Sequence, residues 1–396
     1  MTPRADELSV YLDRDRLIGR LQALVRARSE NPPGEEAEAG GVTSAFCAEL
    51  GLGIATEYAQ PGRPNVIARW EGKPGGRTVG YCSHIDVVPA GDHSLWDVDP
   101  YAAEIRDGAM HGRGTADAKG PIAAALEAVA MLEDAGFEPD ATLELALVSD
   151  EESGGFQGAG YLVDKGLIAA DIAIVGEPTA LRVVRAQRGI AWSRLTTRGV
   201  AAHGSAPERG VNAIYHMAEI VRHLVDSLPD IRHPVVGGPS VSVGTINGGA
   251  KVNIIPASCT IEVDRRTIPG ETDASVIESF EAAVERARQT YPEIDARIEI
   301  VDSGVPFEIA ESSELVQTMT GAISETTGAP AEVIGFRGAS DARFLAHAGA
   351  DVIVFGPGDI AVAHTARESI DLSQLEHGAL AYALAFSRLL AADAER

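Results

Sequence analysis

Short β-rich runs alternate with longer helical patterns along much of this chain, and this alternation limits the folds open to it. Pro121 stands where a first helical turn tolerates proline, and Gly136 closes the same predicted helix. Such alternation is typical of a layered α/β domain. The β-rich runs are residues 65–70, 78–86, 142–150, 171–177 and 351–356, and the helical patterns are residues 15–28, 121–135 and 158–166.

The middle of the chain has a different order of elements. Strands are predicted at 182–199, 239–247, 258–266 and 296–302, and amphipathic helices at 211–228 and 273–291. The order β-α-β-β-α-β indicates a compact α+β domain with a ferredoxin-like layout. Because α/β patterning resumes after Gly304, this domain is inserted into the first one. We expect an α/β fold class: a three-layer α/β/α domain with a mixed, mostly parallel sheet over 1–181 and 303–396, and an inserted ferredoxin-like domain over 182–302.

Charge and cysteine content exclude several classes of protein. Among 396 residues, 58 acids and 33 bases give a formal net charge of −25, which argues against binding to nucleic acid or to an anionic membrane. The three cysteines form no C-x-x-C pair, so a disulfide framework or a cysteine-rich zinc site does not fit. The N-terminus lacks the apolar core of a signal peptide, and no run of 18 apolar residues occurs. We therefore expect a cytoplasmic protein with reduced thiols.

Acids and histidines gather where the predicted strands of the first domain end. In α/β sheets, ligands bind beyond the carboxyl ends of strands. Carboxylates at one such edge repel one another unless a cation lies between them, and mixed imidazole and carboxylate ligands suit Zn²⁺, or more loosely Mn²⁺ or Co²⁺. The side chains expected at this edge are those of His84, Asp86, Asp117, Glu151, Glu152, Glu177 and His364.

Spacing separates the roles of some of these residues. His84 and Asp86 lie two apart on a strand and point the same way, so Asp86 is placed to accept a hydrogen bond from the His84 ring. Glu151 and Glu152 are adjacent, so their side chains diverge. One of the pair is then free to bind metal while the other acts as a general base.

Five stretches of the sequence are similar to one known family. It is the di-zinc amidohydrolase and metallopeptidase family that includes acetylornithine deacetylase, succinyl-diaminopimelate desuccinylase, aminoacylase-1 and glutamate carboxypeptidase. The match runs in order over roughly residues 60–370. The stretches are SHIDVVPAGD (83–92), GRGTADAKG (112–120), SDEESGG (149–155), VGEPT (175–179) and FGPGDIAVAHT (355–365). This sequence departs from the family in TARES (365–369), where relatives more often have an acid followed shortly by an aromatic, and in Ala118, where many have Met.

The resemblance implies two divalent metal ions per chain, Zn²⁺ with Co²⁺ or Mn²⁺ as alternatives. It places one ion among His84, Asp117 and Glu177. It places the other among Asp117, Glu152 and His364, so that Asp117 bridges the two. Glu151 would be the general base, and Asp86 would orient His84.

The inserted domain carries further matches. RGVAAHGSAP (198–207) resembles the family segment whose histidine reaches the active site of the other subunit, which would make His203 an oxyanion-stabilising donor in a homodimer. KVNIIPASCTIEVDRR (251–266) and GASDARFL (338–345) resemble substrate-binding segments, here with Asn253, Arg266 and Arg343. Arginine suits a substrate carboxylate because its planar fork binds two oxygens at once. Arg266 has an alternative role, since it could instead pair with Asp264 or Glu262 on its own strand.

The resemblance implies a metal-dependent amidohydrolase that cleaves the amide of an N-acyl amino acid, a small-molecule substrate. Two alternatives remain open: a dipeptidase or glutamate-type carboxypeptidase with the same metals, and a catalytically silent relative that binds an acylated metabolite. The presence of Glu151 argues against the silent relative, because such a protein would be free to lose its base. The sequence contains no G-x-S-x-G, H-E-x-x-H or G-x-G-x-x-G motif, which argues against a serine hydrolase, a zincin and a dinucleotide-binding protein.

Overall fold

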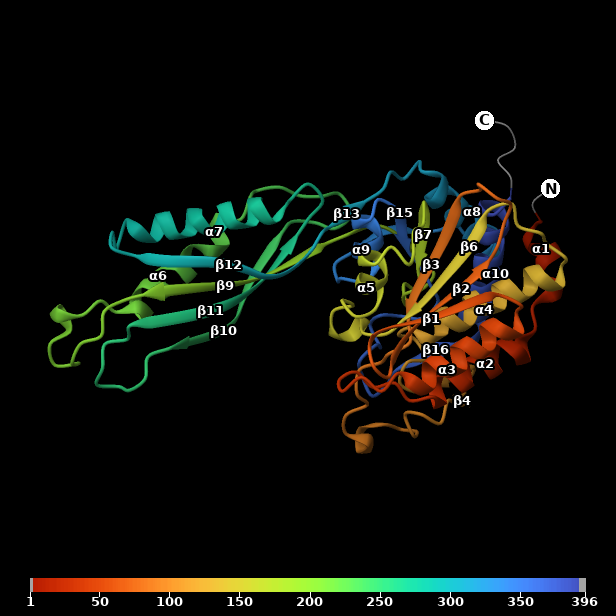
Figure 1. The fold of residues 1–396 in the computed structure, drawn as a ribbon, viewed down its shortest axis with the longest axis horizontal. Helices are drawn as coiled ribbons and strands as arrows, with labels where there is room; N and C mark the ends of the chain where they lie inside the picture. The colour runs from red at the N-terminus through yellow and green to blue at the C-terminus, as the bar shows by residue number, and fades with distance from the viewer. Residues whose placement is uncertain (1–2, 392–396) are drawn as a thin grey trace. The chain divides into compact units, whose positions relative to one another are not determined.

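The structure is a computed structural model that describes residues 3–391. The chain forms two compact units (Figure 1). The first unit comprises Met1–Arg185, Ile309–Ile334 and Ser340–Arg396, and the second comprises Ala186–Glu308 and Gly335–Ala339.

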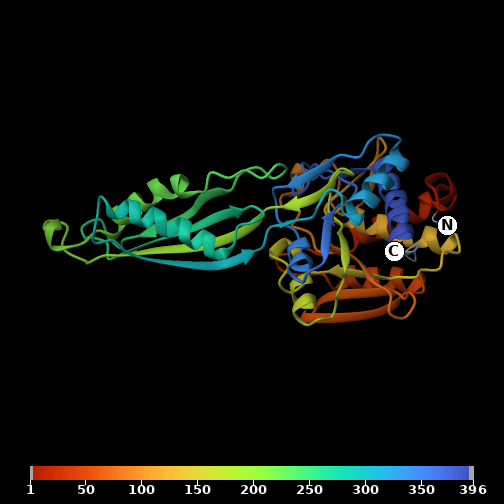
Figure 2. The same ribbon diagram turned by 90° about the horizontal axis from the view of Figure 1, so that it is seen from above.

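A large mixed sheet organises the first unit. Within the described residues its strand order is β1-β2-β6-β3-β7-β15-β8-β13, with β14 pairing with β8. Pairing is parallel in the centre, among β6, β3, β7 and β15, while β1 and β2 form an antiparallel edge (orange in Figure 2). The expected fold class is confirmed. The strands are β1 Gly53–Gln60, β2 Arg63–Trp70, β3 Thr78–His84, β6 Thr142–Val148, β7 Ile172–Val175, β8 Val183–Gln187, β13 Phe307–Glu308, β14 Val333–Phe336 and β15 Asp351–Val354, with a small sheet of β16 Ser369–Asp371, β5 Ala109–His111 and β4 Glu104–Arg106.

Alternate side chains of this sheet face two helical layers. Val79 and Tyr81 of β3 belong to the core that includes α4 and α10. Cys82, the next residue along β3, points to the other face of the sheet and is also buried. On that other face α9 contacts β7 and β15, and α5 contacts α9. The helices are α1 Ala5–Leu8, α2 Arg14–Arg26, α3 Ala37–Glu49, α4 Lys119–Asp134, α5 Ala159–Asp164, α8 Glu314–Thr327, α9 Ala342–His347 and α10 Leu372–Leu389, with 3₁₀ turns η1 Ser9–Tyr11, η2 His93–Leu95 and η3 Glu151–Ser153.

The second unit has the order that the sequence predicts, β9-α6-β10-β11-α7-β12. Its sheet is antiparallel, in the order β10-β11-β9-β12, which is the ferredoxin-like arrangement. Leu195, Met217 and Phe280 belong to one core, so α6 and α7 cover the same face of the sheet. The elements are β9 Gly189–Arg198, α6 Ala213–Leu224, β10 Ser240–Gly248, β11 Ser258–Thr267, α7 Asp273–Arg288 and β12 Asp295–Gly304, with 3₁₀ turns η4 Pro207–Arg209 and η5 Val225–Ser227.

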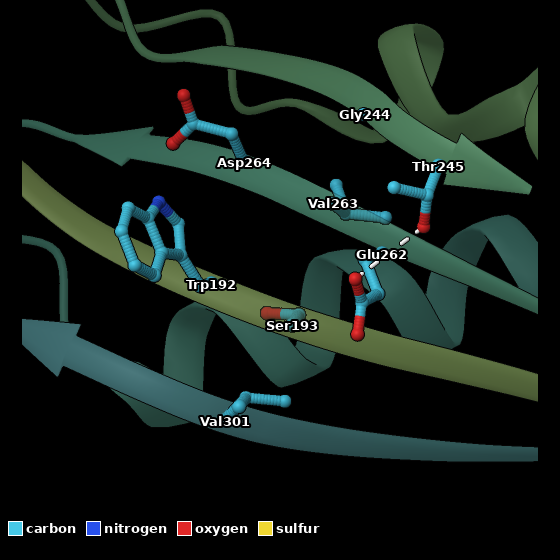
Figure 3. Close-up of a pocket in the computed structure, with 8 residues that line it drawn as sticks. All are labelled: Trp192, Ser193, Gly244, Thr245, Glu262, Val263, Asp264 and Val301. Atoms are coloured by element: carbon cyan, nitrogen blue, oxygen red, sulfur yellow. Dashed lines mark hydrogen bonds between the residues drawn. The ribbon is translucent and has the colours of Figure 1, made fainter.

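The opposite face of this sheet is open. Trp192 and Val301 are exposed there and line a hollow of about 250 Å³ together with Thr245, Glu262 and Asp264 (Figure 3). The strands β10 and β12 both shift register beside this hollow, between Val243 and Thr245 and between Ile300 and Asp302.

One strand prediction is wrong. Residues 182–199 form two strands, β8 and β9, which belong to different sheets. The chain breaks at Arg188, whose N–H donates to the carbonyl of Phe336. The next residue has to be glycine, because a Cβ on Gly189 would lie 2.4 Å from the carbonyl oxygen of Gly304.

Two other expectations concern the described residues. Cys47, Cys82 and Cys259 are buried, and none of them forms a disulfide within the described residues. Among residues 3–391 no helix has both the length and the apolar content needed to cross a bilayer.

Candidate metal centre

The parallel strands β3 and β7 bring two of the predicted ligands to one edge of the sheet. His84 is the last residue of β3, and Glu177 follows β7 by two residues. The two segments that carry them approach each other closely. The Gly176 N–H donates to the Cys82 carbonyl, and the Ser83 hydroxyl donates to the Gly176 carbonyl at 2.8 Å. Only glycine fits there, because a Cβ on Gly176 would lie 2.2 Å from the Tyr81 hydroxyl. The His84 Nε2 and the Glu177 carboxylate are consequently 3.9 Å apart.

The carboxylate of Asp117 lies between two histidines. Its Oδ1 is 3.1 Å from Nε2 of His84, and its Oδ2 is 3.3 Å from Nε2 of His364. The same nitrogen of His364 is 3.1 Å from the carboxylate of Glu152. Asp117 thus presents one oxygen to the pair His84 and Glu177 and the other to the pair Glu152 and His364.

Proton affinities in this cluster depend on its mixed charges. Burial disfavours a charged His84, yet its hydrogen bonds to Asp117 and Asp86 outweigh that effect and raise the pKa of His84 well above its usual value. Hydrogen bonds to Asp117 and Glu152 raise the pKa of His364 to about 10. Burial raises the pKa of Glu177 well above its usual value. In the absence of a metal ion, the closely spaced acids thus favour a proton on each of the two imidazoles.

The donor set fits a divalent metal ion. One ligand atom from each of His84, Asp117 and Glu152 falls within 4.8 Å of the others. Imidazole nitrogen together with carboxylate oxygen is a donor set that Zn²⁺, Mn²⁺ and Co²⁺ accept. A bound cation would also stabilise these acids in their ionised form, because it replaces the protons that they would otherwise hold.

Asp86 makes more contacts than its spacing predicts. The Nδ1 of His84 lies 2.9 Å from the main-chain oxygen of Asp86 and 3.5 Å from its carboxylate, so the carbonyl is the nearer acceptor. The carboxylate instead accepts the N–H groups of Glu151 at 3.3 Å and Glu152 at 3.1 Å. Asp86 thereby connects β3 to the turn that carries the acid pair.

The turn that carries Glu151 is held in an unusual backbone conformation. It begins at Asp150, which has φ +76°, a region that non-glycine residues rarely adopt. Two contacts fix the Asp150 carboxylate: an ion pair with Arg63 at 2.9 Å and a hydrogen bond from the N–H of Gln157 at 2.9 Å. Burial raises the pKa of Glu151 well above its usual value.

Comparison with known proteins agrees with this geometry. The profile of peptidase family M20/M25/M40 matches residues 80–388, which include all five metal-ligand candidates. The chain belongs to this family. It is 32% identical to an acetylornithine deacetylase from Myxococcus xanthus over 318 residues, which cover 78% of this chain and 80% of that protein. It is 33% identical to a succinyl-diaminopimelate desuccinylase from Cereibacter sphaeroides over 328 residues, 80% of this chain and 84% of that protein.

Solved structures show the same fold. An aminopeptidase PepT from Bacillus cereus superposes with a TM-score of 0.79 at 23% identity, covering 96% of this chain and 99% of that one. An M20 family metallo-carboxypeptidase from Sulfolobus solfataricus superposes with a TM-score of 0.75 at 19% identity, covering 95% and 99%. Membership of the M20/M25/M40 family makes this chain a hydrolase that acts on amide bonds.

Two residues around the centre of this family member were not predicted. Asn31 donates to the Asp86 carboxylate at 2.8 Å and accepts a hydrogen bond from Ser153 at 2.8 Å. Glu368 accepts hydrogen bonds from the loop that precedes α4. Asn31 lies in an ordinary polar turn, so nothing in the sequence distinguished it. Glu368 lies in TARES, where the departure from related sequences was visible but its structural role was not.

Arg343 occupies a partly aromatic setting in the first unit. Its guanidinium lies over the rings of Phe344 at 4.6 Å and Phe156 at 5.3 Å, and it donates to the carbonyl of Gly154. Its Nη1 is buried without a hydrogen-bond partner among the described residues. A donor of this kind is suited to a carboxylate.

The remaining predicted residues lie in the second unit. His203 and Asn253 are neighbours: His203 bridges to Ile254, and the N–H of Gly204 donates to the carbonyl of Asn253 at 2.9 Å. Arg266 lies on β11 and pairs with Asp264 at 3.0 Å, which is one of the alternatives that the sequence left open. Asp264 in turn lines the hollow beside Trp192 (Figure 3).

Proposed function

We propose that this chain is a metal-dependent deacylase that hydrolyses the amide bond of an N-acyl amino acid. The observation that carries the proposal is the position of the Asp117 carboxylate, with one oxygen towards His84 and the other towards His364. The names of the relatives at 32% and 33% identity, a deacetylase and a desuccinylase, support the choice of an acyl group as the part removed.

Five residues would hold two divalent ions, which we propose are Zn²⁺, with Co²⁺ or Mn²⁺ as alternatives. His84, Asp117 and Glu177 would hold one, and Asp117, Glu152 and His364 the other. Such ions, when bound, polarise a carbonyl group and lower the pKa of water. Asp117 would serve both, because its two oxygens face different histidines.

Glu151 would move the proton. It stands next to Glu152 in the 3₁₀ turn, and its backbone is fixed by the hydrogen bond from its N–H to the Asp86 carboxylate at 3.3 Å. A carboxylate held in this way accepts a proton from the attacking water and then donates it to the leaving amine. Asp86 and Asn31 act through the turn and are positioning residues.

His203 would stabilise the oxyanion of the tetrahedral intermediate. The N–H of Ser205 donates to Nδ1 of His203 at 3.2 Å, so Nδ1 is an acceptor. The ring proton of neutral His203 then lies on Nε2, which is free to donate to an oxyanion. Asn253, Arg266 and Arg343 would bind the substrate, with the arginines as partners for its carboxylate.

A panel of substrates tests the proposal. The protein is loaded with Zn²⁺ or Co²⁺ and offered N-acetyl-ornithine, N-succinyl-diaminopimelate, other acetyl- and succinyl-amino acids, and dipeptides. We expect release of a free amino acid from one or more acylated substrates at a higher kcat/KM than from any dipeptide. Faster cleavage of dipeptides or glutamyl peptides would establish the alternative of a dipeptidase or glutamate-type carboxypeptidase. Binding of an acyl-amino acid with no turnover would establish the other alternative, a catalytically silent relative that binds an acylated metabolite.

We further propose that the protein is a homodimer in which His203 acts on the partner's site. The strand β10 lies at an edge of its sheet, where unpaired N–H and C=O groups remain available. Exposed apolar side chains lie nearby, on β10, on α6 and in the loop after β10: Ile246, Tyr215, Val252 and Ile254. Closed two-fold pairing would cover such an edge.

Subunit exchange tests the composite site. Chains carrying His203→Ala are mixed with chains carrying Glu151→Gln, each inactive alone. If His203 acts in trans, a mixed dimer has one site with both lesions and one with neither, so part of the activity returns. If exchange is shown independently and no activity returns, or if the protein is monomeric by light scattering, the composite site is rejected.

A further inference from the structure

A buried carboxylate outside the predicted ligand set holds the loop that carries Asp117. We propose that Glu368 is a positioning residue that fixes the Asp117 carboxylate between its two histidines, and so controls metal binding in the centre of the proposed function. The proposal rests on that function, because it assigns to Asp117 the bridging role.

One oxygen of Glu368 gathers three backbone donors. Its Oε1 accepts the N–H groups of Gly114 at 2.9 Å, Ala116 at 3.1 Å and Asp117 at 3.2 Å. Its Oε2 forms an ion pair with the guanidinium of Arg113. Glu368 is 1% exposed, so these contacts are made away from water. A charged acceptor with several backbone donors is among the stronger hydrogen-bond arrangements in proteins.

Three N–H groups of the loop share this one acceptor. Residues 112–120 are all buried, so their N–H groups cannot turn to solvent when the carboxylate is removed. One of the three donors belongs to Asp117 itself. The position of Asp117 along the edge of the sheet is therefore set by Glu368 rather than by the end of a strand, as it is for His84.

Glu368 also belongs to the segment that carries His364. It follows His364 by four residues, and its N–H donates to the carbonyl of Thr365 at 3.4 Å. Its own carbonyl accepts the N–H of Gly112 at 3.0 Å. The residue thus joins the loop before α4 to the loop after β15, and these loops supply the two partners of the 3.3 Å contact between Asp117 and His364.

Co²⁺ titration tests this role, because the absorption spectrum of bound Co²⁺ reports ligand geometry as well as affinity. The variant is Glu368→Gln, which keeps the size of the side chain and one oxygen but cannot pair with Arg113. We expect a folded protein whose Co²⁺ affinity falls by about 10- to 100-fold, as for other residues that hold ligands in place, with an altered visible spectrum.

The matched control is Glu127→Gln. Glu127 is also fully buried, pairs with Arg16 and Arg20, and accepts the N–H of Asp13 at 3.0 Å. It therefore reports the cost of neutralising a buried acid that holds no ligand loop. We expect its variant to lose stability while its Co²⁺ affinity and spectrum match those of the parent.

Each outcome has one meaning. If Glu368→Gln binds Co²⁺ within about twofold of the parent with the same spectrum, or if Glu127→Gln shows an equal loss, Glu368 has no positioning role. If Glu368→Gln does not fold, Glu368→Asp replaces it, and failure of both to fold identifies Glu368 as structural only and overturns the proposal. A parent protein that binds no Co²⁺ refutes the proposed metal centre itself, which separates the two hypotheses.

Discussion

The two histidines of the candidate metal centre approach the same carboxylate from very different surroundings. The His84 side chain is 1% exposed and ends a central parallel strand, whereas the His364 side chain is 52% exposed and lies in the loop after β15 with φ +61°. We call the pair His84 and Glu177 the inner half of the centre, and the pair Glu152 and His364 the outer half. The inner half is fixed by the sheet, and the outer half depends on a turn and a loop.

The difference extends to what holds each half. The inner half depends on two neighbouring strands, with the Gly176 N–H donating to the Cys82 carbonyl across them at 2.7 Å. The outer half, and the Asp117 carboxylate that lies between the two halves, depend on side-chain carboxylates that accept backbone N–H groups. Asp86 holds the turn of Glu152, and Glu368 holds the loop of Asp117. The sheet therefore fixes the positions of His84 and Glu177, and the buried carboxylates of Asp86 and Glu368 fix the segments that carry Glu152 and Asp117.

The largest expected effect concerns Glu151, which belongs to neither half. Glu151→Gln should lower kcat by about 10²- to 10⁴-fold, because it removes the proton acceptor. Both halves should remain, so bound metal measured by mass spectrometry should stay near that of the parent. Glu152→Gln is the matched neighbour and should instead lose metal. A Glu151→Gln enzyme within tenfold of the parent kcat, or one that loses metal as Glu152→Gln does, would reverse the roles of the pair.

The next effect compares the two histidines directly. In metal-free protein, His84→Ala removes the buried imidazole that lies beside Asp86 and Asp117 and leaves Asp117 with His364 alone. Loss of one partner of a buried pair costs about 3–5 kcal/mol. His364→Ala removes a partner that is half exposed, which costs about 1 kcal/mol or less. Chemical denaturation of the chelated proteins measures both. Equal losses of stability would show that exposure does not distinguish the halves.

The sequence predicts the inner half well, and the reason is physical. Strand ends are visible in a β-rich pattern, and parallel strands end at one edge, so the pattern alone places His84 and Glu177 together. The layered α/β class and the ferredoxin-like order of the second unit follow from the same patterns. The break at Arg188 does not, because it depends on the approach of Gly304 to Gly189.

The sequence predicts less of what supports the outer half. The contacts of Glu368 are with backbone N–H groups more than 250 residues away, and such groups have no residue type to reveal them. The spacing predicts that the Asp86 carboxylate accepts a hydrogen bond from the His84 ring. Because β3 ends at His84, the main-chain carbonyl of Asp86 lies nearer to the ring, and the carboxylate is left for the turn of Glu151 and Glu152.

Chelation should sharpen the comparison further. Each ion present at about 100 times its Kd contributes about 2.7 kcal/mol of stability that chelation removes. We expect the outer ion to leave first, because His364 is open to solvent and its loop can move without disturbing the sheet. Stopped-flow release with a zinc-sensitive dye should show two phases in the parent. His364→Ala should retain the slow phase alone, and release in one phase from the parent would contradict the division into halves.

The smallest effect concerns the hydrogen bond between Ser153 and Asn31, the residue that donates to the Asp86 carboxylate. Ser153→Ala removes the hydrogen bond to Asn31, whose net contribution to stability is about 0.5–1.5 kcal/mol. Because Ser153 ends the 3₁₀ turn of Glu151 and Glu152, we also expect kcat to fall by a few-fold, while KM stays unchanged. Ser303→Ala is the control, since Ser303 donates a similar hydrogen bond of 2.9 Å to Asp273 in the second unit. Both variants should lose comparable stability, but only Ser153→Ala should lose turnover. Equal kcat values for the two variants would mean that Asp86 alone holds the turn, and that the network ends at Asn31.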